Sequence, residues 1–540
     1  MKQYFFIIIC LSLLTAKCAQ SEAGSAVFKA EAFSGEENSH QAGNAYTQLT
    51  LDSLQLENFI QKHEVNAKLA NKMRTFYQQR QYQYAWFNED GLAQQTQAFW
   101  NLHDQFVNLT NDSTIMDLEF HQRVATLMED EIMPPEEELQ KLEMQLTQHF
   151  FDYAKIAYAG KMDPEKLQWN IPRKKLDAVK LLDSLIEGNG ASLEEWEPVN
   201  KQYSLLKKQL VLFHDLEKNN NWEVIKLGSN KIIRPGDSSP VIPVIRQRLK
   251  DLGDLPQKTD QVVYDNSLVT AVKRFQYRHG LKQDGVLGPA TIKALNVTPE
   301  EKMEQLLVNM ERMRWMPEHK AGKRIIANIP EFRLYVYEED QKVMQMDIVV
   351  GKEAHKTVVF SDELKHVVFS PYWNIPASIT RNEILPAMNR DPNYLSKKNM
   401  EITGKSNGQP VIRQKPGPDN ALGKVKFLFP NRYAIYFHDT PAKSLFDRNR
   451  RAFSHGCIRL KEPFKMAQYL LKDKPEWTDE RIRQAMNRGS ELWVNLDEAV
   501  PVFICYFTAF VDDEGLVHFR DDIYGHDQKM SKQLFAHGKH

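Results

Sequence analysis

The chain has 540 residues, of which 42% are hydrophobic and 26% are charged, a balance typical of soluble globular protein. This length exceeds one compact core, so we expect two to four domains. The formal net charge of −1 excludes a global field that would attract nucleic acid or an anionic membrane. No nucleic-acid partner is expected, and partners have to be inferred from individual sites.

Residues 1–18 have the pattern of a signal peptide. Lys2 precedes an apolar stretch, Tyr4 to Ala16, that is too short to span a bilayer comfortably. We expect export to the periplasm or cell envelope, with no transmembrane anchor after cleavage. Cys18 leaves acylation open, which would make an outer-membrane lipoprotein, although Lys17 fits lipoprotein processing poorly. An uncleaved apolar tail is the remaining alternative.

The next part of the chain is predicted to be helical. Residues 19–50 are polar and weakly periodic, as in a flexible leader. Residues 51–230 predict a helical scaffold domain, because apolar residues such as Leu51, Leu54 and Phe59 recur at helical spacing.

Residues 235–297 predict a compact module of three short helices. The second begins at Asn266, a residue type that caps helices well, and Gly280 ends it. The third opens at Gly288 with Pro289 in its first turn.

Residues 322–500 predict a β-rich domain, because apolar and polar residues alternate there. Within it, residues 374–426 are rich in Pro, Asn and Gly and too long for an ordinary connection, so we expect a lid-like insertion. Residues 501–540 are expected to be a C-terminal strand extension. The whole chain therefore predicts a multidomain α+β fold.

One cysteine of the β-rich domain stands close to two histidines. Residues 454–459 read Ser-His-Gly-Cys-Ile-Arg, and His438 precedes Cys457 by nineteen positions (457 − 438 = 19). A free thiol is only about a few per cent ionised at neutral pH, so a nucleophilic cysteine needs a base nearby. His438 ends a predicted strand, Tyr433 to Phe437, and is the candidate general base and acid for Cys457.

The neighbours of Cys457 have separate expected roles. Gly456 has no side chain, so the backbone N–H groups of Gly456 and Cys457 are the candidate oxyanion hole. His455 is expected to shape the pocket. Arg459 could hold a substrate carboxylate or order the loop, and the sequence leaves both readings open.

Two alternatives compete with nucleophilic catalysis. The two histidines and Cys457 could bind zinc, but the sequence has no C-x-x-C or H-x-x-x-H pair here, so no metal and no cofactor are predicted. Cys457 could also pair with Cys505 in a disulfide, although Cys505 lies in an apolar run typical of a buried strand.

The residues around Cys457 resemble a known family. Residues 454–457 together with His438 resemble the signature of L,D-transpeptidases, bacterial cell-wall enzymes with a YkuD-type catalytic domain. Residues 369–376 and 415–431 resemble the stretches that precede this signature in the family.

Other parts of the chain extend the resemblance. The 235–297 module is similar to a three-helix peptidoglycan-binding domain. With its helical N-terminal part and its insertion, the chain resembles the large, YcbB-type branch of the family. Arg459 stands where many short members have Asn.

The resemblance implies a reaction in cell-wall biogenesis. Cys457 would attack the amide between the diamino acid and the terminal D-alanine of a tetrapeptide stem, with His438 as base and acid. The amine of a neighbouring stem would then resolve the thioester into a 3→3 cross-link. An L,D-carboxypeptidase-type hydrolase and a non-catalytic peptidoglycan-binding protein are the alternatives.

The resemblance also implies partners and further site residues. Peptidoglycan stem peptides and glycan are the expected partners, carbapenem-type compounds are expected inhibitors, and no cofactor is implied. The secondary candidates for substrate binding are Ser454, His455, Arg459, Tyr372 and Trp373.

Overall fold

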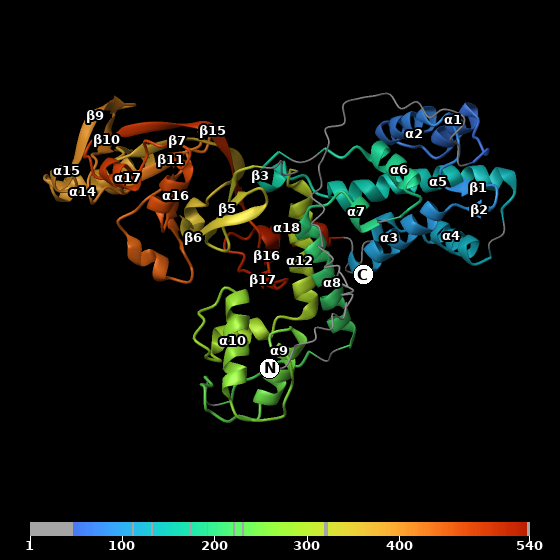
Figure 1. Ribbon diagram of the computed structural model, residues 1–540, viewed down its shortest axis with the longest axis horizontal. Coiled ribbons are helices and arrows are strands. Elements are labelled where there is room, and N and C mark those ends of the chain that lie inside the picture. Colours follow the sequence, from blue (N-terminus) through green and yellow to red (C-terminus); the bar gives the residue numbers. More distant parts are fainter. Residues whose placement is uncertain are drawn as a thin grey trace, which may run out of the picture.

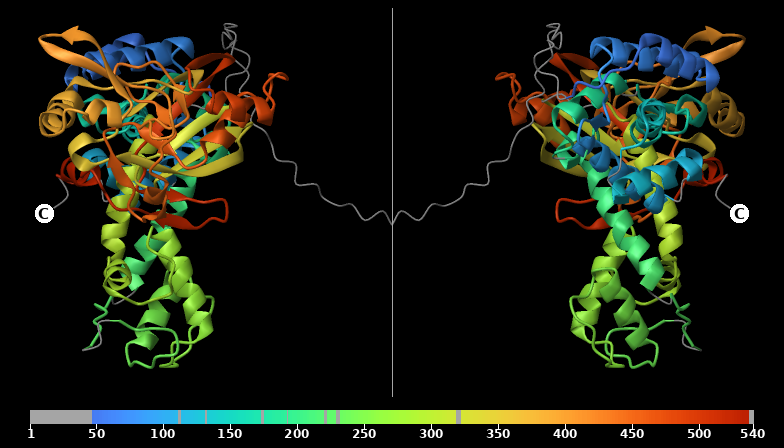
Figure 2. Two further views of the ribbon diagram at one scale, coloured as in Figure 1. Left: turned by 90° about the vertical axis from the view of Figure 1, so that its left-hand side faces the viewer. Right: turned by 90° about the vertical axis from the view of Figure 1, so that its right-hand side faces the viewer.

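The computed structural model describes residues 47–536 except 111–112, 131–132, 173–174, 192, 220–221, 229–231 and 318–321. The predicted signal peptide, Cys18 and nearly all of the predicted leader lie outside the described residues. Helices α8 and α12 run through the middle of the molecule, with a helical part on one side, a β-rich part on the other and a small helical module at one end (Figure 1, Figure 2). None of the described helices is long and apolar enough to cross a membrane.

The helical scaffold has a hydrophobic core of its own, built from residues between Leu51 and Ile186. Side-chain caps start its first helices, because Asp52 accepts the N–H of Leu54 and Asn66 accepts the N–H of Leu69. The elements are α1 (Ser53–Lys62), α2 (Ala67–Gln79), β1 (Phe87–Asn88), β2 (Gly91–Leu92), α3 (Gln94–Thr110), α4 (Leu118–Asp130), α5 (Glu136–Ala154), α6 (Ala178–Glu187) and α7 (Leu193–Trp196).

The scaffold predicted for residues 51–230 extends past this core. Helix α8 (Lys201–Asn219) packs along α12 (Pro299–Trp315) and contributes to the core of the β-rich part instead. Strand β3 (Trp169–Asn170) pairs in parallel with β7 (Val359–Phe369) at the edge of the large sheet. Helix α8 and strand β3 therefore join the scaffold to the β-rich part, although both lie within residues 51–230, which we predicted to be scaffold.

The predicted three-helix module is present as α9 (Ile242–Asp251), α10 (Asn266–Arg278) and α11 (Pro289–Leu295) around a core of its own. One detail differs from the prediction. The N-cap of α10 is Asp265, whose carboxylate accepts the N–H of Leu268 at 3.0 Å, so Asn266 is the first helical residue.

The β-rich part is a ten-stranded sheet that closes on itself, since β11 pairs with β12 on one side and with β7 on the other. Leu334, Ile348, Val367 and Val502 are fully buried inside it. Besides β7, its principal strands are β4 (Arg324–Asn328), β5 (Arg333–Glu338), β6 (Gln341–Gly351), β11 (Val425–Leu428), β12 (Phe437–His438), β13 (Ala452–Ser454), β14 (Ile458–Leu460) and β15 (Leu492–Cys505).

The C-terminal part differs from the strand extension predicted from residue 501. Strand β15 crosses this boundary, because residues 502–505 pair with β4 in the central sheet. A hairpin of β16 (Ala509–Val511) and β17 (Val517–Phe519) follows, and then α18 (His526–Leu534), which packs against α12. Two further helices of the β-rich part precede β15, α16 (Pro463–Leu470) and α17 (Asp479–Met486).

The predicted insertion at 374–426 is a small subdomain at the far end of the β-rich part (Figure 1). Strands β8, β10 and β9 form a separate three-stranded sheet, and four isoleucines, Ile375, Ile379, Ile384 and Ile412, form a separate core. Its elements are β8 (Trp373–Asn374), α13 (Ala377–Ile379), α14 (Leu385–Arg390), α15 (Tyr394–Lys397), β9 (Met400–Ser406) and β10 (Gln409–Gln414).

Candidate active site

Two short parallel strands bring the predicted base and nucleophile together. In β12 and β14, Phe437 lies opposite Ile458 and His438 lies opposite Arg459. Phe437 and Ile458 are fully buried in the core. Side chains alternate along a strand, so His438 and Arg459 face the other side, and Cys457 immediately precedes β14.

Four side chains interact on this face. The rings of Tyr436 and His438 lie 5.8 Å apart, and Tyr436 acts to lower the pKa of the Cys457 thiol. Arg459 acts electrostatically on both His438 and Cys457. We call Tyr436, His438, Cys457 and Arg459 the thiol cluster. Tyr436 was not among the predicted site residues, because only its register next to Cys457 reveals its role.

The strand predicted from Tyr433 to Phe437 is interrupted by a turn. Asn431 donates through its side-chain amide to the carbonyl of Ile435 at 2.7 Å and accepts the N–H of Tyr433 at 3.0 Å. Ala434 has a left-handed backbone with φ of 53°, so regular pairing begins only at Phe437. The turn aims the Ala434 carbonyl at the Cys457 thiol, which donates to it with an Sγ–O distance of 3.6 Å.

The tautomer of His438 follows from its hydrogen bond. His438 is buried, and its Nδ1 lies 2.5 Å from the backbone carbonyl of Asp439, which can only accept. Nδ1 therefore carries the ring proton, and Nε2 offers the lone pair. The backbone carbonyl thus fixes the tautomer and the orientation of the His438 ring.

Both partners are electrically neutral in the resting site. Burial, followed by the positive charge of Arg459, lowers the pKa of His438 to about 3. Burial raises the pKa of the Cys457 thiol, although Tyr436 and Arg459 act against this rise. Cys457 and His438 are therefore a neutral thiol and a neutral imidazole on the same face of the paired strands.

The loop before Cys457 is held by a buried hydroxyl. Ser454 Oγ donates to the Cys457 carbonyl at 2.6 Å and accepts the Gly456 N–H at 3.1 Å. Thr357 Oγ1 donates to the Gly456 carbonyl at 2.8 Å. Gly456 has φ of 115°, a conformation that an L side chain rarely adopts, which explains a glycine here.

These contacts change two sequence expectations. The Gly456 N–H is engaged by Ser454, so of the two expected oxyanion donors only the Cys457 N–H lacks a hydrogen-bond partner among the described residues. Ser454 is only 2% exposed and its hydroxyl is used within the loop. In this structure Ser454 therefore holds the loop, and its expected contact with substrate stays a prediction.

Arg459 is a half-buried cation without a counter-ion. Within the described part of the chain its side chain makes no hydrogen bond or ion pair, and its Nε is buried without a partner. Burial lowers the pKa of its guanidinium. An unpaired guanidinium beside a nucleophile suits a carboxylate supplied by a ligand.

The remaining candidates border the insertion. The ring of Tyr372 lies under the Arg413 guanidinium at 4.1 Å, and Trp373 packs against the insertion's isoleucine core. Among the described residues, neither forms a hydrogen bond, ion pair or ring contact with the thiol cluster. His455 does reach the insertion, since its Nε2 lies 3.1 Å from Glu383 Oε1.

The disulfide alternative is wrong. Cys457 and Cys505 are both free, and Cys505 is fully buried in β15, where its backbone pairs with Asn328.

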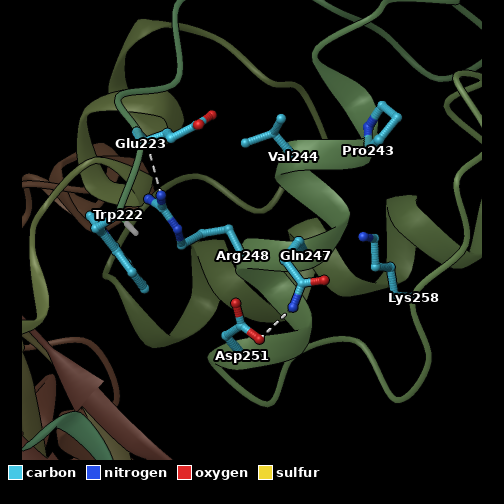
Figure 3. Close-up of a pocket in the computed structure, with 8 residues that line it drawn as sticks. All are labelled: Trp222, Glu223, Pro243, Val244, Gln247, Arg248, Asp251 and Lys258. Carbon is cyan, nitrogen blue, oxygen red and sulfur yellow. Dashed lines mark hydrogen bonds between the residues drawn. The ribbon is translucent and has the colours of Figure 1, made fainter. Parts of the chain in front are cut away.

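The three-helix module borders a cavity of about 260 Å³ (Figure 3). The Arg248 guanidinium stacks on Trp222 at 3.5 Å and donates to the Glu223 carbonyl at 2.9 Å. Gln247 donates to Asp251 at 2.7 Å. The principal polar groups of this cavity are therefore already used within the protein. The lining residues are Trp222, Glu223, Pro243, Val244, Gln247, Arg248, Asp251 and Lys258.

Comparison with known protein families agrees with this geometry. Residues 322–482, which carry the thiol cluster and the insertion, match the family described as "L,D-transpeptidase catalytic domain" (YkuD). Residues 322–482 are therefore similar to an L,D-transpeptidase catalytic domain. Residues 238–295 match the family described as "Putative peptidoglycan binding domain", and residues 71–210 match a "Scaffold domain".

Individual relatives of the L,D-transpeptidase domain are distant. A Haemophilus influenzae protein named "Putative L,D-transpeptidase" is 32% identical over 258 residues, which cover 45% of this chain and 50% of that protein. The chain thus spans about half the length of this curated relative.

Two solved structures are also similar to the chain. An L,D-transpeptidase from Mycobacterium smegmatis is 14% identical, covers 35% of this chain and 61% of its own, and has a TM-score of 0.20. One from Stackebrandtia nassauensis is 14% identical, covers 51% of this chain and 94% of its own, and has a TM-score of 0.23. Because both TM-scores are low, the similarity to L,D-transpeptidases is carried by the sequence matches.

Proposed function

We propose that the chain is an L,D-transpeptidase that forms 3→3 cross-links in peptidoglycan through a thioester on Cys457. The observation that carries this proposal is the thiol cluster, in which an oriented neutral imidazole, an unpaired guanidinium and one thiol share one face of two paired strands. An L,D-transpeptidase domain around the cluster and a peptidoglycan-binding module in the same chain support the substrate class.

In the first half-reaction Cys457 Sγ attacks the carbonyl carbon of the stem's diamino acid. His438 Nε2 takes the thiol proton, which avoids forming a free thiolate in a site that disfavours one. The Cys457 N–H donates to the developing oxyanion. When the C–N bond breaks, the imidazolium returns the proton to the departing amine of D-alanine, and a thioester remains.

Arg459 binds the carboxylate of the terminal D-alanine in this proposal. That carboxylate is part of the leaving group, so its charge is close to the scissile amide. A charge-assisted hydrogen bond to a half-buried guanidinium contributes about 1.5–3 kcal/mol. The carboxylate leaves with D-alanine and vacates this position before the acceptor arrives.

The second half-reaction runs the same proton transfers in reverse. The side-chain amine of a neighbouring stem attacks the thioester carbonyl, and His438 removes a proton from that amine. The C–S bond breaks, Cys457 regains its proton, and the new amide is the cross-link. Water competes with the amine for the thioester. In this proposal the Glu383–His455 contact holds the inserted subdomain where it limits the access of water to the thioester.

This reaction requires an envelope location. Peptidoglycan lies outside the cytoplasm, so the proposal includes export by the N-terminal segment and work in the periplasm during cell-wall biogenesis.

The decisive experiment supplies the purified protein with a disaccharide-tetrapeptide as donor and acceptor. We expect free D-alanine and a tetrapeptide–tripeptide dimer by mass spectrometry, together with a covalent adduct when a carbapenem is added. Cys457→Ala abolishes all three products, and Cys505→Ala, which removes the other described cysteine, leaves them. If free tripeptide forms without dimer, the enzyme is a hydrolase. If no product forms at all, the chain is a peptidoglycan-binding protein without catalytic activity.

A further inference from the structure

A histidine cluster in the scaffold domain is unrelated to the thiol cluster. Helices α3, α4 and α5, which carry it, lie on the opposite side of α8 and α12 from the catalytic sheet (Figure 1). His103 and Asp104 are on α3, His121 is on α4 and His149 is on α5.

Three donor atoms converge in this cluster. Asp104 Oδ1 lies 3.2 Å from His103 Nδ1 and 2.8 Å from His121 Nε2. One ligand atom from each of these three residues lies within 4.8 Å of each of the others. Ligand atoms about 2.0–2.2 Å from a tetrahedral zinc ion are separated by about 3.3–3.6 Å. The two distances from Asp104 Oδ1 are slightly shorter than this, and the third separation is within 4.8 Å, so small side-chain movements would complete a three-ligand set.

The cluster is not a complete hydrogen-bond network. His103 is only 1% exposed, and no described group is in hydrogen-bonding geometry with its buried Nε2. The Nε2 of His149, whose ring centroid lies 4.6 Å from that of His103, is buried and equally unpartnered among the described residues. The Asp104 carboxylate therefore engages Nδ1 of His103 and Nε2 of His121, while these two other ring nitrogens stay unpaired among the described residues.

A ligating imidazole must be neutral. With a metal at Nδ1 of His103, the ring proton sits on Nε2, the buried nitrogen that has no hydrogen-bond partner among the described residues.

We propose that His103 Nδ1, Asp104 Oδ1 and His121 Nε2 bind one divalent transition-metal ion, with Zn²⁺ the best match. Two imidazoles and one carboxylate suit zinc, whereas Ca²⁺ and Mg²⁺ need a shell of oxygen ligands. The side chains of Asp104 and His121 are 37% and 28% exposed, so an ion can enter and water can fill the fourth position. The bound ion would fasten α4 to α3.

The first test is zinc titration of the full chain after treatment with EDTA. We expect the wild type to bind one more Zn²⁺ than Asp104→Asn or His121→Gln, or to bind it at least tenfold more tightly. Mg²⁺ should give no comparable binding. His63→Gln, which removes an exposed histidine of the same domain, should bind zinc as the wild type does. Any ion held by Cys457 is common to all four proteins and cancels in the comparison.

A second readout does not depend on the variants' stability. Trp100 lies 5.1 Å from the rings of both His103 and His121, so Co²⁺ in the wild type should quench Trp100 fluorescence. The cobalt complex should show visible d–d bands without a thiolate charge-transfer band, and Trp100→Phe should remove most of the quenching. Equal zinc binding by wild type, Asp104→Asn and His121→Gln, or cobalt bound only through a thiolate, would overturn the proposal.

Discussion

His455 Nε2 lies 3.1 Å from Glu383 Oε1, so the loop that carries Cys457 is tied directly to the inserted subdomain. Glu383 belongs to a π-helical turn, Thr380–Ile384, whose Ile384 is anchored in the insertion's core. Burial lowers the pKa of His455, so at neutral pH this contact is a hydrogen bond from a neutral ring to a carboxylate. The contact gives the insertion a defined position beside the nucleophile.

Glu383→Gln should weaken this tie and let more water reach the thioester. Both side chains are partly exposed, 37% for His455 and 54% for Glu383, so the contact contributes at most about 1 kcal/mol. We expect the ratio of hydrolysed tripeptide to cross-linked dimer to rise about two- to fivefold. Asp391→Asn, which breaks the exposed pair with Lys397 in the same subdomain, is the matched control. Equal ratios in all three proteins would rule out a role for the contact.

Local sequence patterns predicted most of the fold for clear physical reasons. Phe332, Leu334 and Val336 alternate with half-buried residues, as the predicted strand required. Helix α12 was not predicted, because its buried face includes polar residues that hide the apolar period. One of them, Arg312, is fully buried and paired with Asp527 at 2.6 Å, a partner more than two hundred positions away.

The residues of the candidate site show the same contrast between what local sequence patterns indicate and what only the fold brings together. Cys457 and His438 could be proposed from the sequence because their residue types are rare and chemically specific. Tyr436, Glu383 and Thr357 were missed, because their roles depend on strand register and on contacts across the insertion. The hydrogen bond from the Gly456 N–H to Ser454 could not be foreseen for a similar reason, since only the folded loop brings the two groups together.

Arg459→Gln should abolish the preference of the enzyme for a free terminal carboxylate on the donor stem. A charge-assisted hydrogen bond of about 1.5–3 kcal/mol corresponds to a preference of roughly 10- to 150-fold over a donor amidated at that position. The measurement is kcat/KM for both donors with both proteins. If the variant loses rate equally on both donors and keeps the preference, Arg459 acts on the thiol and not on the carboxylate.

Alkylation of Cys457 by iodoacetamide should be slow at neutral pH and should accelerate steadily from about pH 6 to about pH 9. Burial raises the pKa of the thiol, so the thiolate fraction stays small until the solution is alkaline. Arg459→Gln should slow alkylation further, because Arg459 lowers the pKa of this thiol. Intact-mass measurement against time gives the rate. A rate that is already maximal at about pH 6 would indicate a thiolate–imidazolium pair and contradict the neutral resting site.

Acid should open the strands that carry the site, and His438 should account for part of this effect. The pKa of His438 is about 3 in the folded protein, against 6.5 for an ordinary histidine. Between these two pKa values, the unfolded segment therefore binds a proton at His438, whereas the folded segment does not. The contribution of neutral His438 to the free energy of opening is complete above about pH 6.5. It is lost as pH falls toward 3, by up to about 1.4 kcal/mol per pH unit.

Removing that proton site tests the assignment. In His438→Gln, the loss of opening free energy between about pH 6.5 and about pH 5 should be smaller than in the wild type by about 2 kcal/mol. Hydrogen exchange of the β12 and β14 amides, corrected for intrinsic rates, reports this opening alone, whereas a chain with several cores does not unfold in one step. The same pH dependence in both proteins would mean that the imidazole is accessible to protons in the folded state, and the proton transfer from Cys457 would then begin from a charged ring.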